Sequence, residues 1–137
     1  MGLASARSII FCKALNMSLN LNTLRRGDVV LANLKGALGT ERNGKDIVCL
    51  IVQNDVGNKF SPMTIIVPLT DHNQNKNLPI QVPVTSKERG NNGHDSVIEC
   101  GQIRTIDKNR ISVVISRLPE HVMEKVDQAI KVSLALS

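Results

Sequence analysis

Residues 47–70, which read IVCLIVQNDVGNKFSPMTIIVPLT, decide the fold. Two apolar runs, residues 47–52 and 64–69, are rich in valine and isoleucine and are too short for typical helices. The polar residues between the two runs favour turns. This pattern predicts two strands joined by a polar loop. Because each run is apolar throughout, both faces of each strand should be covered.

The other segments predict further short strands and one helix. Strands are expected over residues 28–34, 80–85, 96–99, 102–106 and 111–118. A helix is expected over residues 119–134, because apolar residues recur there at helical spacing: Val122, Met123, Val126, Ile130 and Leu134. This order predicts a mainly β domain with a C-terminal helix, built as a small antiparallel β-barrel.

Two prolines and a long loop add detail. Pro83 predicts that its strand lies at an edge of the sheet, since proline cannot donate a ladder hydrogen bond. Pro119 is expected at the first helical position. Residues 35–46 form a glycine-containing connection that is long enough to predict a lid or a binding loop.

The composition is that of one domain with an aliphatic core. The chain has 137 residues, 42% of them hydrophobic, with two phenylalanines and no tyrosine or tryptophan. No apolar run reaches the ~18 residues that a membrane-spanning helix needs. The spacing of Cys12, Cys49 and Cys100 matches no metal or redox motif, and the last two lie in apolar segments and are expected in the core. Such thiols fit a reducing cytoplasm.

The basic charge is concentrated at the N-terminus. Residues 1–26 contain four basic residues and no acidic one, whereas the rest of the chain contains 13 basic and 12 acidic residues. The net charge of +5 therefore predicts no general nucleic-acid-binding surface, and any such site must come from local clustering. Residues 1–24 lack a secretory signal pattern and are expected to be a disordered extension, or to come from a start upstream of Met17. The folded domain is therefore expected to comprise residues 25–137.

Seven short motifs follow one another along this domain. They are RGDV at residues 26–29, GTE at 39–41, QND at 53–55, GNKFSP at 57–62, LT at 69–70, DSVI at 95–98 and QIRTIDK at 102–108. In this order and at this spacing, they resemble the MazF/PemK family of toxins from bacterial toxin–antitoxin systems. The resemblance implies an SH3-like, PemK-type β-barrel that pairs as a homodimer.

The resemblance also implies an activity and partners. Such toxins are sequence-specific endoribonucleases that cleave single-stranded RNA without a metal or other cofactor. The ribose 2′-hydroxyl attacks the adjacent phosphate and leaves 2′,3′-cyclic phosphate and 5′-hydroxyl ends, which requires a base, an acid and a donor toward the phosphorane charge. The expected inhibitor is an antitoxin of the MazE type, whose acidic, disordered tail would cover the RNA groove.

The motifs further imply site residues. Thr70 matches the catalytic threonine, whose hydroxyl would donate to a phosphoryl oxygen. Glu41 matches an acidic loop residue that is either an acid or base or a solvated carboxylate. RNA contacts are expected from Thr40, Asn54, Asp55, Lys59, Gln102 and Arg104. Lys108 is a further cation expected near Gln102.

One position departs from the family. Its members carry Arg-Pro at the start of the second strand, where this chain has Ile47 and Val48. In the family, that arginine stabilises the phosphorane. Lys45 would share a strand face with residue 47 if the strand extends that far, whereas Arg42 would reach the site from the preceding loop. Lysine lacks the planar fork with which arginine binds two phosphate oxygens.

Three functions are left open. The first is RNA cleavage with Lys45 or Arg42 in place of the missing arginine. The second is that of a homologue that binds antitoxin or RNA without cutting. The third is inhibition of DNA gyrase, by proteins that share this barrel and act through the end of a C-terminal helix. The ordinary apolar residues at 134–136 do not favour the third.

Overall fold

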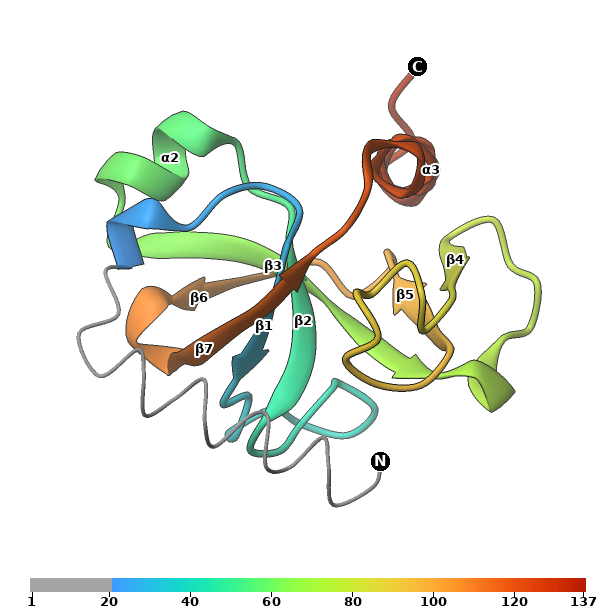
Figure 1. Ribbon diagram of the computed structural model, residues 1–137, viewed down its shortest axis with the longest axis horizontal. Coiled ribbons are helices and arrows are strands. Elements are labelled where there is room, and N and C mark those ends of the chain that lie inside the picture. Colours follow the sequence, from blue (N-terminus) through green and yellow to red (C-terminus); the bar gives the residue numbers. More distant parts are fainter. Residues whose placement is uncertain (1–20) are drawn as a thin grey trace.

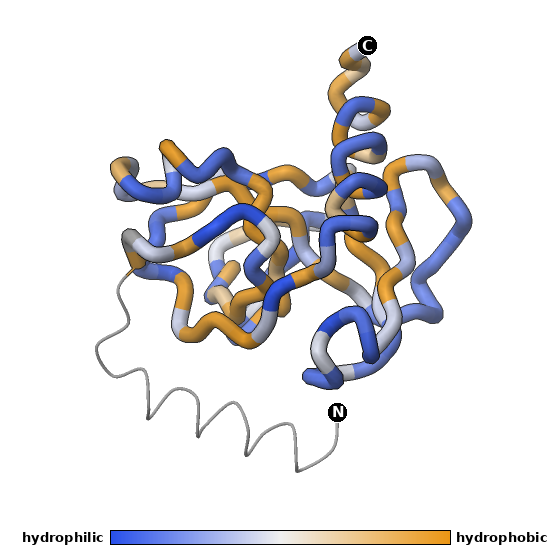
Figure 2. The backbone as a smooth tube through the Cα atoms, turned by 45° about the horizontal axis from the view of Figure 1, so that its top comes forward, coloured by the Kyte–Doolittle hydropathy of each residue, from blue (hydrophilic) through white to orange (hydrophobic). Residues whose placement is uncertain are grey.

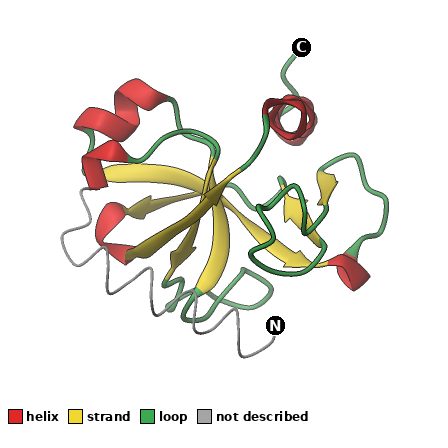
Figure 3. Cartoon of the chain, in the orientation of Figure 1, coloured by secondary structure: helices red, strands yellow, loops and turns green. Residues whose placement is uncertain are grey.

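The computed structural model describes residues 21–137 (Figure 1). In this part of the chain, the strands are β1 (Asp28–Ala32), β2 (Ile47–Ile51), β3 (Met63–Asp71), β4 (Gln81–Val84), β5 (Ser96–Glu99), β6 (Arg104–Asp107) and β7 (Ile111–Arg117). The helices are α2 (Asp55–Phe60) and α3 (Glu120–Ser133), with short 3-10 helices η1 (Leu21–Thr23), η2 (His72–Gln74) and η3 (Lys108–Arg110). Figure 3 shows the strands at the centre and the helices around them.

The strands form a curved antiparallel sheet centred on β3. The order is β4-β5-β3-β2-β1-β7, and β6 also pairs with β3. Strand β3 changes partners along its length: its start pairs with β6, its middle with β2 and its end with β5. The path ends at β4 and β7, so the fold is barrel-like without closing. The predicted class, mainly β with a C-terminal helix, is confirmed.

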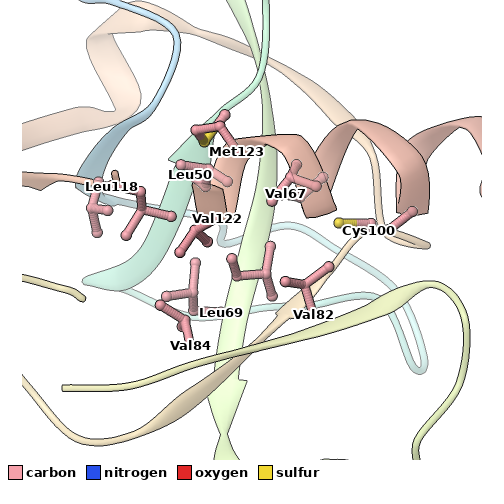
Figure 4. Close-up of a cluster of buried hydrophobic side chains, with 13 residues drawn as sticks. Leu50, Val67, Leu69, Val82, Val84, Cys100, Leu118, Val122 and Met123 are labelled. Atoms are coloured by element: carbon pink, nitrogen blue, oxygen red, sulfur yellow. The ribbon is translucent and has the colours of Figure 1, made fainter. Parts of the chain in front are cut away.

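The alternation of side chains divides the core into two clusters. Along β3, Val67 and Leu69 face the first cluster, which includes α3, and Ile66 faces the second. Strand β2 divides in the same way, with Leu50 in the first cluster and Cys49 in the second. Figure 4 shows side chains of the sheet packed against α3 in the first cluster. Both faces of these strands are therefore buried, as their continuous apolarity predicts.

Helix α3 is amphipathic, and its first half covers the sheet. Val122, Met123 and Val126 are buried, as predicted. The prediction that the buried stripe continues to Leu134 is wrong, because Leu134 is 53% exposed. Figure 2 shows the reason: the C-terminal end of α3 extends away from the sheet. Pro119 is the N-cap rather than the first helical residue, a difference of one position that is common at helix ends.

Helix α2 replaces the unstructured polar loop that was expected between β2 and β3. The Asn54 side chain caps this helix by accepting from the backbone N–H of Gly57 at 2.8 Å. Asn58 is fully buried; its amide donates to the Gln53 carbonyl at 2.9 Å, and its side-chain oxygen accepts from the Thr64 hydroxyl at 2.8 Å. Residues that favour turns in general serve here as a helix cap and a buried polar contact.

Three smaller predictions are confirmed. Residues 35–46 contain no helix or strand, β4 with its Pro83 is an edge strand, and Cys49 and Cys100 are fully buried. Burial raises the pKa of both thiols to about 12. Both cysteines are therefore protonated core residues at neutral pH.

The predicted N-terminal extension, including Met17 and Cys12, lies outside the described residues except for residues 21–24. Among these four, Leu24 is buried in the second core cluster, and Leu21 packs against it. Within residues 21–137, no helix combines the length and apolarity needed to cross a membrane.

Candidate functional site: a pocket with two arginines

A pocket of about 540 Å³ opens between the loop of residues 35–46 and the sheet. Ile66 and Pro68 of β3 line one side of it, and the segment between β5 and β6 lines another. Five residues that were predicted for the site line this pocket: Thr40, Glu41, Arg42, Gln102 and Arg104. The fold thus brings together two segments that are about 60 residues apart in sequence.

Hydrogen bonds fix the position of the loop. The Glu41 carboxylate accepts from the backbone N–H of Leu38 at 2.7 Å. The side-chain oxygen of Gln102 accepts from the backbone N–H of Arg42 at 3.0 Å. Glu41 and Gln102 therefore organise the loop, a role that the sequence did not indicate.

Arg42 and Arg104 bring two positive charges to the pocket, which we call the arginine pocket. Both charges act on the buried thiol of Cys49, where they oppose the rise in pKa that burial causes. The Nε atom of Arg42 is buried without a hydrogen-bond partner among residues 21–137. One Nη atom of Arg104 lies 3.5 Å from the Leu34 carbonyl. Two guanidinium groups in one pocket suit an anionic ligand such as a phosphate.

Of the two cations considered in place of the missing arginine, Arg42 lines the pocket and Lys45 does not. Ile47 begins β2 and lies on the same strand face as Cys49. The charge of Arg42 lowers the pKa of the Cys49 thiol on that face, against the larger effect of burial. Lys45 is exposed and is not among the residues that line the pocket.

Thr70 lies just beyond the pocket, near the end of β3. It is half-buried and shares a strand face with Pro68, which lines the pocket two residues earlier. Its hydroxyl donates to Oε1 of Glu99 at 3.2 Å. The side-chain amide of Gln81 donates to the same oxygen at 2.8 Å. The sequence-based prediction missed Glu99 and Gln81, because only the register between β4 and β5 places them opposite each other.

Three residues that were predicted to contact RNA lie at helix α2 instead: Asn54, Asp55 and Lys59. The Asp55 carboxylate accepts from the backbone N–H of Arg26 at 2.7 Å, and this bond is the main reason that the pKa of Asp55 is lowered. The Lys59 ammonium lies 5.3 Å from the centre of the Phe60 ring. None of the three lines the arginine pocket.

Lys108 is also absent from the pocket. It is only 4% exposed, and its ammonium group donates to the backbone carbonyl of Asn58. Lys108 therefore adds no charge to the arginine pocket, because its ammonium group is held at α2.

The histidines show no constellation with a chemical role. His121 lies 2.7 Å from Glu88, and His72 lies 3.0 Å from Asp71. Within residues 21–137, no group of three or more histidine, cysteine, aspartate or glutamate side chains is arranged to hold a metal ion.

Comparison with known sequences identifies the family. The profile of the PemK-like, MazF-like toxins of type II toxin–antitoxin systems matches residues 25–134, and the chain belongs to this family. It is 44% identical over 113 residues to endoribonuclease EndoA of Bacillus subtilis, covering 82% of this chain and 96% of that protein. It is 41% identical over 114 residues to endoribonuclease MazF of Staphylococcus epidermidis, covering 83% of this chain and 93% of that protein.

Solved structures share the fold. MazF from Deinococcus radiodurans superposes with a TM-score of 0.70 at 19% identity, covering 82% of this chain and 97% of that chain. An endoribonuclease from a mycobacterial species was solved in complex with its cognate antitoxin. It superposes with a TM-score of 0.70 at 19% identity, covering 84% of this chain and 98% of that chain. These likenesses agree with the barrel-like topology that the motifs predicted.

Proposed function

We propose that this protein is the toxin of a toxin–antitoxin pair and that it cleaves single-stranded RNA in the arginine pocket, without a metal. The observation that carries this proposal is the convergence of Arg42, Arg104 and Gln102 in one pocket beside β3. Two curated relatives of more than 40% identity are named endoribonucleases, which supports the same activity. RNA would have to be single-stranded, because loop residues read bases only when they are unpaired and splayed out.

The proposed reaction begins with the ribose 2′-hydroxyl, which attacks the adjacent phosphate. It leaves a 2′,3′-cyclic phosphate and a 5′-hydroxyl end. Arg42 and Arg104 stabilise the charge of the phosphorane, because their planar groups each offer parallel donors to two oxygens. Thr70 supplies a hydroxyl beside the reacting atoms, and Thr40 and Gln102 offer hydrogen bonds to the RNA.

Arg42 takes the role of the arginine that is missing at Ile47. The support is positional, since Arg42 lines the pocket together with Arg104 and Gln102. Lys45 does not line the pocket. We assign Glu41 to ordering of the loop rather than to proton transfer, because its carboxylate accepts from the Leu38 N–H.

The test is incubation of the purified protein with a long single-stranded RNA in EDTA, beside a Thr70→Ala control. We expect fragments with 5′-hydroxyl ends that disappear in the control. Fragments that require an added divalent ion would contradict the metal-independent mechanism. RNA that stays intact at high protein concentration would contradict the proposed activity.

A second candidate is a homologue that binds RNA or antitoxin without cutting. The observation that favours it is Ile47, an aliphatic residue where the family has its arginine. Losing one donor to the transition state costs on the order of a hundredfold in rate. Binding of a single-stranded RNA that is never cleaved would identify this candidate.

Two partners complete the proposal. An antitoxin of the MazE type, with an acidic and disordered tail, would bind across the arginine pocket because the charges are complementary. Homodimer formation is supported by the exposed apolar side chains of Val132, Leu134 and Leu136. They belong to the C-terminal end of the chain, where α3 extends away from the sheet (Figure 2). Competition between an acidic peptide and RNA tests the first, and the molar mass in solution tests the second.

A further inference from the structure

A chain of hydrogen bonds fixes the hydroxyl of Thr70. The hydroxyl donates to Oε1 of Glu99 at 3.2 Å. A threonine hydroxyl has a single proton, and an ionised carboxylate can only accept. As long as this bond is present, the Thr70 oxygen offers only lone pairs to its other neighbours. It is then suited to accept a hydrogen bond from a substrate, and it cannot also donate to a phosphoryl oxygen.

The Glu99 carboxylate is itself held in place by Gln81. The Gln81 amide nitrogen donates to Oε1 of Glu99 at 2.8 Å and to the Gln74 carbonyl at 3.1 Å. Its side-chain oxygen accepts from the backbone N–H groups of Lys76 and Leu78, at 2.9 and 3.3 Å. With donors and acceptor all engaged, the orientation of the Gln81 amide is determined. A hydroxyl, a base in contact with it and a third group that orients the base form the arrangement by which hydroxyl groups are activated.

The register of the sheet places this arrangement on the face of β3 that also lines the arginine pocket. Thr70 lies opposite Val97, and Gln81 lies opposite Glu99. Glu99 follows Val97 by two residues, so the three polar side chains share one face of the sheet. That face continues along β3 to Pro68, which lines the pocket.

We propose that Glu99 is a positioning residue and proton acceptor that acts through Thr70. This inference rests on the proposed RNA cleavage. The proton of the ribose 2′-hydroxyl passes to Oγ1 of Thr70, while the proton of Thr70 passes to Oε1 of Glu99. The bond between O2′ and phosphorus forms, the bond between phosphorus and O5′ breaks, and O5′ takes a proton from water. Glu99 then gives its proton to the hydroxide that remains, which restores both the water and the carboxylate. Arg42 and Arg104 face the phosphoryl charge, and Thr70 faces the nucleophile.

The test compares kcat and KM of Glu99→Gln, Thr70→Ala and the double variant with those of the wild-type protein, on one single-stranded RNA in EDTA. Glu99→Gln keeps the size of the side chain and removes its basicity. We expect kcat to fall about a hundredfold and KM to change less than about threefold. The double variant should be no slower than Thr70→Ala, because both changes break the same relay. When kcat is measured as a function of pH, its decrease at low pH should disappear in Glu99→Gln.

Further variants separate this role from a structural one. Thr70→Ser keeps the hydroxyl and should retain most of the activity. Gln81→Leu removes the group that orients Glu99 and should lower kcat about tenfold. Glu124→Gln, a change at an exposed carboxylate on α3, is the matched control and should leave kcat unchanged. The melting temperature of each variant checks that it is folded.

Two results would overturn the inference in different ways. If Glu99→Gln and Glu99→Leu match or exceed the wild-type rate while Thr70→Ala is inactive, then Thr70 acts as a donor and Glu99 restrains it. If the wild-type protein itself does not cleave RNA, the proposed function fails, and the relay fails with it.

Discussion

Residues of the arginine pocket and of helix α2 were both predicted to contact RNA, yet the two regions differ in whether a buried polar group is left without a partner. At α2, the side chains of Asn54, Asp55 and Asn58 make hydrogen bonds within the protein. In the pocket, the Nε atom of Arg42 is buried with no partner in the described chain. This contrast is the reason that we place the proposed RNA site in the arginine pocket, where a buried donor has no partner in the described chain. The predictions below change each region separately, in order of decreasing effect.

The largest effect is expected for Asn58→Ala, and it is an effect on stability. Asn58 is fully buried, and its loss leaves the Gln53 carbonyl and the Thr64 hydroxyl without this partner. We expect the free energy of unfolding in urea to fall by about 3 kcal/mol. Asn109→Ala, at an exposed asparagine, is the control. RNA cleavage per folded molecule should not change, and a loss of cleavage without a loss of stability would contradict the structural role of α2.

The opposite pattern is expected for Arg42→Ala. This change removes a cation that faces the phosphorane in the proposed mechanism, so the rate should fall by about a hundredfold, or about 2.7 kcal/mol in the activation barrier. Stability should change little, because the Arg42 Nε makes no hydrogen bond within the described residues. Lys45→Ala, outside the pocket, should stay close to the wild-type rate. If Lys45→Ala is the slower variant, Lys45 is the stand-in for the missing arginine.

A smaller change is expected for Gln102→Ala. The side chain accepts from the Arg42 N–H at 3.0 Å, and its loss releases the loop that carries Arg42. The rate should fall about tenfold, and the free energy of unfolding by about 1 kcal/mol. Steady-state kinetics and urea unfolding measure the two effects. An unchanged rate would show that the loop does not need this bond to position Arg42.

The smallest effect concerns Asp55 and pH. Hydrogen bonds, chiefly from the Arg26 N–H, lower the pKa of this carboxyl from its ordinary value of 3.8. A lowered pKa means that the carboxylate stabilises the fold above pH ~4 and that this contribution disappears as the pH falls through the lowered value. Asp55 is exposed, so the difference between wild type and Asp55→Asn should be well under about 1 kcal/mol at pH 7. Urea unfolding at pH 7 and pH 3 should show a difference that shrinks with acid; a difference that grows would contradict the sign.

The strands and part of the candidate site could be predicted from the sequence. Uninterrupted runs of valine and isoleucine predicted β2 and β3, because a strand that is apolar on both faces is stable only when both faces are buried. The arginine pocket was predicted through the motifs that contain Thr40, Glu41 and Gln102. Helix α2 was missed because asparagine caps helices as readily as it forms turns. Glu99 and Gln81 were missed because their contact depends on strand register, which no local pattern reveals.

The most direct measurement is an NMR titration of the backbone amides with a short single-stranded RNA in which every 2′-hydroxyl is methylated, so that it cannot be cleaved by this mechanism. It separates the two regions without relying on catalysis. We predict chemical-shift changes at Thr40, Glu41 and Arg42 and at Gln102 and Arg104, with residues 54–60 unaffected. Shifts that cluster at residues 54–60, with none in the arginine pocket, would contradict the assignment of the RNA site.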